Sequence, residues 1–219
     1  MDFSNYFPFW KDLNEEQQKQ LSSAAVQRTV KKNTLFYHGG ADCLGLILVE
    51  SGQLRAYMLS ESGQEITLYR LFEYDSCLFS ASCIIHSLQF DLSIEAEKDT
   101  TVWIIPPDLF KKISEESLAV STYVNQLMAS RFSEVIWLIE QILWKSFDKR
   151  LASFLLEESA VENADVLKIT HEKIAKHLGT AREVVTRMLR YFQSEGLVKL
   201  SRGTIEILDS VRLYQFTEN

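Results

Sequence analysis

Apolar and polar positions follow a strand-like pattern over the first half of the chain. Between Val26 and about Ile105 the apolar residues form short β-rich runs, at residues 34–37, 44–50, 54–59, 66–71, 92–96 and 101–105. Glycine-containing turn signals and Lys98-Asp99 separate these runs, and Pro106-Pro107 ends them because proline cannot donate to a sheet ladder. A short helix is expected first, over residues 14–25, with Asn14 as its cap and Gln17 bonding back. The pattern predicts a small β-sandwich or roll.

From Asp108 the pattern becomes helical and stays so for longer than in a typical globular helix. Over residues 121–144 one apolar seam repeats with alternating spacings of four and three, at Met128, Phe132, Val135, Ile139 and Ile142. Trp137, Leu138 and Leu143 make a second side apolar. A helix that is apolar on two sides needs two partners, so we expect it to pack on its own β-domain and on the same helix of a second subunit. The alternative is a single amphipathic helix buried within a monomer.

Residues 168–207 show two short helices and a hairpin. A further amphipathic helix is expected before them at 147–158, followed by an acidic, loop-like stretch at 157–165. Thr170 is placed to cap the first short helix, and Gly179 supplies the permissive backbone of a tight turn. Thr180 is expected to begin the second helix, with Glu183 at the capping-box position. Its inward stripe is Val184, Val185, Met188, Leu189 and Phe192. Residues 197–200 and 204–207 predict a two-stranded wing.

The charge distribution favours DNA as the partner of this segment, although the whole chain carries a net charge of −7. Residues 168–202 hold eight lysines and arginines against three glutamates, a net charge of +5. A helix buried on one side and basic on the other suits the major groove, where arginine bonds guanine and glutamate accepts from cytosine. The candidate base-reading residues are Arg182, Glu183, Thr186 and Arg187. The candidate phosphate contacts are Thr170, His171, Arg190 and Arg202. Glu183 as a capping-box partner, and Arg182 and Arg190 as solvated surface charges, stay open as alternatives.

Composition excludes several other classes. With 46% hydrophobic and 24% charged residues the chain is of ordinary globular composition. We find no basic start followed by an apolar run and no stretch of about 18 apolar residues, so the expectation is a cytoplasmic protein without a membrane partner. We also find no phosphate-binding loop, no G-x-S-x-G and no histidine cluster of the metal-dependent cupin type, so an enzyme is not expected. A winged helix that binds protein as a scaffold is the distant alternative.

The stretch from Ile169 to Leu189, I-T-x-E-x-I-A-x-x-L-G-T-A-R-E-V-V-T-R-M-L, resembles the recognition motif of the CRP/FNR family of transcription regulators. Residues 147–152 are similar to the family's hinge, and residues 44–71 to its β-roll. The resemblance implies an α+β fold with an N-terminal cupin-like β-roll of the cyclic-nucleotide-binding type at 1–115. It further implies a long dimerisation helix at 116–145 and a winged helix-turn-helix at 146–219. Double-stranded DNA with a palindromic operator, a homodimer and RNA polymerase are the implied partners.

The chain departs from the family where its members bind cyclic nucleotides, with a Gly-Glu pair followed by an Arg-Ser/Thr pair. The corresponding residues here are Phe79, Ser80, Phe90 and Asp91. A cyclic phosphate would have no guanidinium there, so cyclic AMP is not the expected effector. With Val135 and Ile136 from the long helix, these positions predict a pocket that either holds an apolar or aromatic effector or is filled by its own side chains.

The three cysteines offer little further chemistry. The chain has no cysteine before Cys43, so an N-terminal cysteine group for an iron–sulfur cluster is missing. Cys77 and Cys83, with His86 nearby, are candidates for a thiol switch or for haem ligation, although buried structural thiols are the simpler interpretation. The expected function is therefore a DNA-binding regulator controlled allosterically from the β-roll by an effector or redox signal. The effector, the target operators and the sign of regulation are not encoded in a recognisable pattern.

Overall fold

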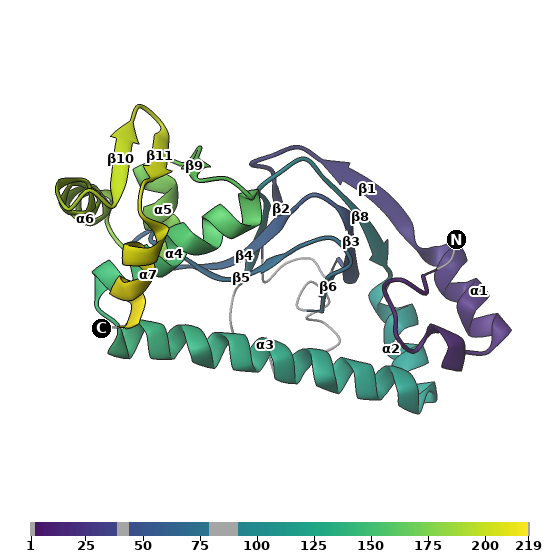
Figure 1. Cartoon of the computed structure of the whole chain (residues 1–219). Helices are drawn as coiled ribbons and strands as arrows, with labels where there is room; N and C mark the ends of the chain where they lie inside the picture. The colour runs from purple at the N-terminus through teal and green to yellow at the C-terminus, as the bar shows by residue number, and fades with distance from the viewer. Residues whose placement is uncertain (1–2, 39–43, 79–91, 219) are drawn as a thin grey trace. The chain divides into compact units, whose positions relative to one another are not determined.

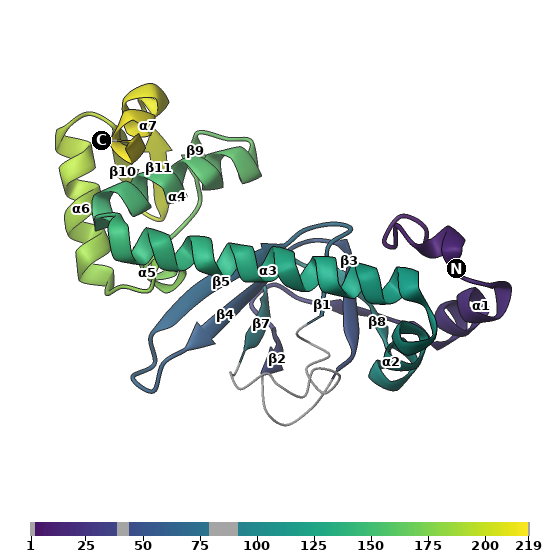
Figure 2. The ribbon, with the colours of Figure 1, turned by 90° about the horizontal axis from the view of Figure 1, so that it is seen from below.

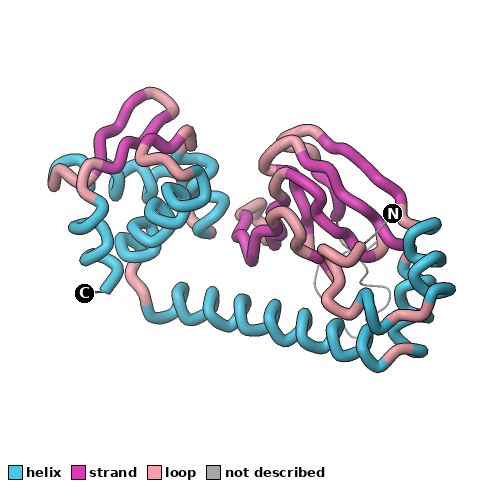
Figure 3. The backbone as a smooth tube through the Cα atoms, turned by 45° about the vertical axis from the view of Figure 1, so that its right-hand side comes forward, coloured by secondary structure: helices cyan, strands magenta, loops and turns pink. Residues whose placement is uncertain are grey.

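The computed structural model describes residues 3–38, 44–78 and 92–218. Contacts divide the chain into two compact units. Unit 1 contains residues 1–59 and 68–136, and unit 2 contains residues 60–67 and 137–219. Figure 3 distinguishes the helices of the chain from its strands by colour.

Unit 1 is built on two four-stranded antiparallel sheets. The first has the order β1-β8-β3-β6 and the second the order β2-β7-β4-β5 (Figures 1 and 2). The strands are β1 (Val26–Val30), β2 (Leu35–His38), β3 (Leu46–Ser51), β4 (Leu54–Leu59), β5 (Glu65–Leu71), β6 (Ser76–Cys77), β7 (Ser93–Ala96) and β8 (Thr100–Ile105). The strands predicted from the apolar runs are confirmed to within two residues at each end. β1 and β6 were not predicted, because β1 is mostly exposed and β6 has only two residues.

Strand β3 separates two hydrophobic clusters, which explains its unbroken apolar sequence. Ile47 and Val49 lie in a cluster with residues of both sheets, such as Leu54 and Val102. Leu46 and Leu48 lie in the other cluster, with Phe110 and the N-terminal aromatic residues. Successive side chains of a strand point to opposite faces, so both faces of β3 are buried.

Helical segments cover the second of these clusters, the one that contains Leu46, Leu48 and Phe110. They are the 3₁₀ turn η1 (Trp10–Asp12), α1 (Glu15–Ala24), α2 (Pro107–Glu116) and the first part of α3 (Leu118–Trp144). The predicted capping box of α1 is confirmed, since the Asn14 side chain accepts from the Gln17 N–H at 2.8 Å and the Gln17 side chain accepts from the Asn14 N–H at 3.3 Å. Phe3, Phe7 and Phe110 are among the fully buried rings of this cluster.

Helix α3 is a single helix of 27 residues. Its Val120 and Arg131 are buried in unit 1, and Met128 is partly buried against both clusters of that unit. Other large apolar residues of α3 remain exposed, at Phe132, Ile136, Trp137, Ile139, Ile142, Leu143 and Trp144. Of the predicted seam residues, Met128 therefore packs into the core of unit 1. The exposed residues of the seam begin at Phe132.

Unit 2 is a small helical domain with a three-stranded sheet of order β10-β11-β9. Its elements are α4 (Phe147–Glu162), β9 (Val166–Leu167), α5 (His171–Leu178), α6 (Arg182–Ser194), β10 (Val198–Ser201), β11 (Thr204–Ile207) and α7 (Ser210–Glu218). The predicted end of α4 is wrong: the helix continues through the acidic stretch to Glu162 and ends where Asn163 takes a left-handed conformation, with φ 48°. The short strand β9 and helix α7 were not predicted.

Candidate nucleic-acid interface

Two helices joined by a tight turn form the centre of unit 2. Thr170 caps α5 as predicted, because its hydroxyl oxygen accepts from the Lys173 N–H at 3.2 Å. Helix α5 ends at Gly179, whose φ of 63° lies in the left-handed region that favours glycine. This geometry is the one expected of the turn in a helix-turn-helix.

The predicted start of the second helix is wrong by one position. Ala181, not Thr180, is the N-cap of α6, and no side chain bonds to the end of the helix. The reason lies in the preceding turn, where the Thr180 N–H donates to the carbonyl of Ala175 at 3.1 Å and so still belongs to the end of α5. Alanine has no side-chain acceptor, so Glu183 has no capping-box partner and is exposed at the start of α6.

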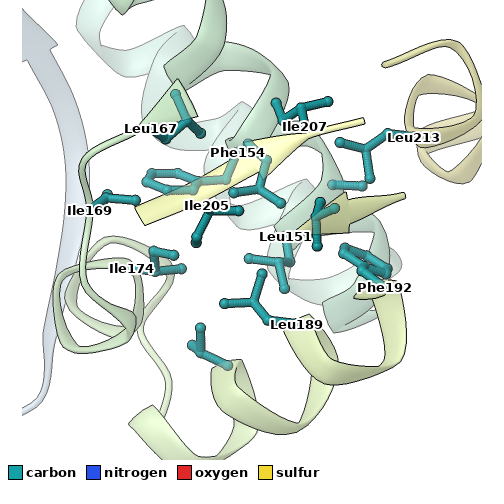
Figure 4. Close-up of a cluster of buried hydrophobic side chains, with 14 of the residues drawn as sticks. Leu151, Phe154, Leu167, Ile169, Ile174, Leu189, Phe192, Ile205, Ile207 and Leu213 are labelled. Atoms are coloured by element: carbon teal, nitrogen blue, oxygen red, sulfur yellow. The ribbon is translucent and has the colours of Figure 1, made fainter. Parts of the chain in front are cut away.

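Helix α6 is anchored on one face by a hydrophobic core. Val185, Leu189 and Phe192 are fully buried. They pack with residues of α4, α5 and the sheet, including Leu151 and Ile174 (Figure 4). Figure 4 shows Leu189 and Phe192 pointing from α6 into this cluster. The spacing of the buried residues fixes the rotation of α6 about its axis.

The opposite face of α6 carries the predicted DNA-contacting residues. Arg182, Glu183, Arg187 and Arg190 are exposed, and Thr186 is half-buried. Arg182, Thr186 and Arg190 are spaced four residues apart, so they form one ridge along the helix. Helix α6 therefore presents a charged surface with three arginines over about two turns.

The wing is a two-stranded hairpin that lies next to α6 in the chain. β10 and β11 pair from Val198 with Ile207 to Ser201 with Thr204, and Arg202 is exposed in the turn between them. The Leu200 N–H donates to the side-chain oxygen of Gln193 on α6 at 3.1 Å. This bond ties the hairpin to the helix and so fixes where Arg202 is presented.

His171 makes a contact that its predicted role as a phosphate ligand did not include. Its ring Nδ1 lies 2.9 Å from the Thr186 hydroxyl, which joins the first residue of α5 to the exposed ridge of α6. Burial, followed by the positive charges of Arg182 and Arg190, lowers the pKa of His171 below 6.5. The imidazole is therefore mainly neutral at pH 7.

Arg150 stabilises the turn between α5 and α6. It was not predicted to be a functional residue. Its guanidinium donates to the carbonyl of Leu178, the last residue of α5, at 3.2 Å. Its burial lowers the pKa of the guanidinium. The sequence signal was available, because Arg150 belongs to the hinge motif at residues 147–152 that the family resemblance rests on.

The predicted effector pocket falls largely on residues that the structure does not describe. Phe79, Ser80, Phe90 and Asp91 lie outside the described residues, and so does Cys83, one of the two candidate redox thiols. Of its two positions on α3, Val135 is half-buried and Ile136 is 41% exposed. The structure therefore gives this pocket no geometry.

Unit 1 does contain a buried polar contact that the sequence analysis missed. Arg131 of α3 is 9% exposed, and its guanidinium lies 4.6 Å from the centre of the Tyr69 ring. It pairs with both carboxylate oxygens of Glu134, at 2.8 and 2.9 Å. The Tyr69 hydroxyl lies 3.7 Å from the sulfur of Cys77, which is buried. Burial raises the pKa of Tyr69 well above its usual value.

Residues 3–38, 44–78 and 92–218 contain no group of three or more histidine, cysteine and acidic side chains that could hold a metal ion. Over the same part of the chain no helix has the length and apolar character needed to cross a bilayer.

Taken together, a β-roll, a long helix with exposed apolar residues and a winged helix-turn-helix define the architecture of a DNA-binding regulator. Two domain families match it: the cyclic nucleotide-binding domain over residues 27–117 and the Crp-like helix-turn-helix domain over residues 149–216. A crystal structure of a protein from Eubacterium rectale assigned to the CRP/FNR family is 61% identical, with a TM-score of 0.96. The match covers 98% of this chain and 100% of that one.

More distant relatives also match this chain over most of its length. The transcriptional activator protein anr of Pseudomonas aeruginosa is 27% identical over 194 residues, which cover 85% of this chain and 78% of the relative. The cyclic AMP receptor protein of Thermus thermophilus is 27% identical over 179 residues, which cover 82% of each. The chain belongs to the CRP/FNR family of DNA-binding transcription regulators, and these relatives are regulators, not enzymes.

Proposed function

We propose that the chain acts as a homodimer on a palindromic operator, reading bases with α6 and responding to a signal in its β-roll. The observation that carries the proposal is the face of α6 opposite its buried stripe, where Arg182, Glu183 and Arg187 are exposed. Arginine can bond guanine O6 and N7 with both of its terminal nitrogens, and glutamate can accept from cytosine N4. In the proposal these three residues contact base edges in the major groove and so distinguish one DNA sequence from another.

Residues at the edges of this face position the protein on the duplex. Arg190 at the end of the ridge and Arg202 in the wing are both exposed and contact phosphate in the proposal, with Thr170 and His171 at the start of α5. Phosphate contacts contribute affinity but no base preference. The two kinds of residue therefore have different signatures in a binding experiment.

Dimerisation is part of the proposal, and the exposed apolar residues of α3 support it. Phe132 and Trp144 are 67% and 81% exposed, and an exposed apolar surface of this kind is typical of an interaction site. A symmetric pair of winged helices would bind two half-sites about 34 Å apart, one turn of DNA. The palindrome follows from this symmetry.

The proposed signal is not cyclic AMP. The proposal rests on the sequence at the nucleotide-binding positions, which lacks the arginine that the phosphate requires. In addition, Arg131, the one arginine of the α3 sequence, already pairs with Glu134. An apolar or aromatic effector, or a pocket filled by its own side chains, fits these residues better. A thermal-shift titration with cyclic AMP should leave the melting temperature unchanged, and a saturable rise would contradict this part of the proposal.

The DNA-reading part is tested with duplexes selected by the full-length protein from a randomised library. Arg187→Ala should weaken the selected operator by about 1–3 kcal/mol and relax the preference at one base pair in each half-site. Arg202→Ala should weaken all sequences alike and reduce the slope of log affinity against log salt by roughly 0.9 for each lost phosphate contact. Arg212→Ala on α7 is the matched control, because Arg212 is exposed but contacts Glu195 of its own unit. Unchanged operator preference in Arg187→Ala would refute the assignment.

A further inference from the structure

Thr186 of α6 uses its hydroxyl group inside the protein. The hydroxyl lies 2.9 Å from the carbonyl oxygen of Arg182, one turn earlier in the helix, and 2.9 Å from Nδ1 of His171. A threonine hydroxyl has one hydrogen to donate and two lone pairs to accept with. The carbonyl of Arg182 can only accept, so if the hydrogen goes there, His171 Nδ1 must be the protonated nitrogen and donate to the hydroxyl oxygen. If His171 Nδ1 is unprotonated, the hydrogen goes to the ring instead.

In both arrangements the only hydroxyl hydrogen is bound within the protein. Thr186 therefore has no donor left for a base, and its oxygen keeps one free lone pair in the first arrangement and two in the second. The two hydrogen bonds also select the side-chain rotamer, because threonine in a helix is otherwise divided between two rotamers. The γ-methyl group takes part in neither hydrogen bond and is the apolar group that this half-buried side chain can offer to a base.

We infer that Thr186 contacts the methyl group of a thymine with its own γ-methyl, and that His171 is the positioning residue that holds Thr186 in this orientation. The inference rests on the proposed function, since it assigns a base to a residue already placed on the reading face. Contact between a threonine methyl and the thymine methyl is a recognised form of major-groove readout. It makes one position of each half-site sensitive to the methyl group of the base, not to its hydrogen-bonding edge.

The surroundings of His171 agree with a positioning role. Burial, followed by the charges of Arg182 and Arg190 on the same ridge, lowers the pKa of the ring, so a neutral imidazole with either tautomer is available at pH 7. His171 thus acts through Thr186, a role that its position at the start of α5 had not indicated.

The test compares thymine with uracil, which lacks only the methyl group, at each thymine of the operator selected by the full-length protein. The wild type should lose about fourfold in affinity at one thymine per half-site, the size expected for one buried methyl group. Thr186→Val keeps a γ-methyl group without the hydroxyl, and it should retain this loss because valine in a helix has one strongly preferred rotamer and needs no hydrogen bond to hold it. Thr186→Ser keeps the hydroxyl without the methyl and should bind thymine and uracil duplexes equally.

The same probes test His171. His171→Ala should reduce the difference between thymine and uracil, and His171→Gln, which keeps a donor, should restore part of it. Equal uracil sensitivity in the wild type and Thr186→Ser would overturn the methyl contact, and full sensitivity in His171→Ala would overturn the positioning role. If the wild type enriches no sequence from the library, the proposed function fails, and the inference fails with it. Equal melting temperatures of the variants show that each still folds.

Discussion

The exposed apolar surface of α3 gives the most direct prediction about assembly. Phe132 leaves 67% of its surface in contact with solvent. An aromatic side chain buries about 150–250 Å², so pairing removes roughly 100–170 Å² from water in each protomer. At about 25 cal/mol per Å² this is ~2.5–4 kcal/mol per protomer. The contact occurs twice in a symmetric dimer.

Phe132→Ala should therefore weaken dimerisation substantially. If only half of the calculated stabilisation is realised, the loss is about 3 kcal/mol for the dimer, or roughly a 100-fold higher dissociation constant. Sedimentation equilibrium over a range of protein concentrations measures this shift. Leu118→Ala is the control, because Leu118 is 84% exposed on the same helix but lies outside the seam. A monomeric wild type, or equal dissociation constants for both variants, would refute the reasoning.

Two further predictions concern the winged helix. Phe192→Ala removes a fully buried ring and should destabilise unit 2 by about 3–5 kcal/mol in urea unfolding. Tyr191→Ala, at a position that is 44% exposed, should destabilise it much less. Similar urea midpoints for the two variants would contradict the assigned core. Burial, followed by the charges of Arg182 and Arg190, lowers the pKa of His171 below 6.5 in the folded protein. As the pH drops, the unfolded chain therefore protonates this histidine before the folded protein does. The free energy of unfolding should fall as the pH drops through 6.5 and level off below the folded-state pKa. Urea unfolding above and below pH 6.5 should show a smaller pH effect in His171→Gln, and an equal effect would assign the dependence to other groups.

The winged helix was largely predictable because its sequence pattern and its packing agree. The period of Val185, Leu189 and Phe192 predicts which face of α6 is buried, and the structure buries these residues completely. The Thr170 cap and the Gly179 turn follow from local chemistry that does not depend on the rest of the fold. The same period placed Arg182 and Arg187 on the opposite face, where both are exposed.

The failures arise where packing at a distance decides the structure. β9 has two residues, and its partner Ile205 lies almost forty residues later, so no local pattern could indicate it. The acidic stretch after α4 was expected to be a loop, but glutamate and alanine are good helix formers and the helix extends to Glu162. His171 could be placed at the start of α5 from the sequence, but its contact with Thr186 depends on how α5 and α6 pack.

Helix α3 links the two proposed functions of the chain, sensing and dimerisation, through adjacent residues. Arg131 is buried against Tyr69 and pairs with Glu134, whereas the next residue, Phe132, is largely exposed. Consecutive residues of an α-helix are about 100° apart around its axis, and the helix between them is stiff. A signal that rotated α3 at Arg131 would therefore also rotate Phe132. Under the proposed function this gives the β-roll a short physical route to the dimer seam, because a rotation of the helix moves both positions together.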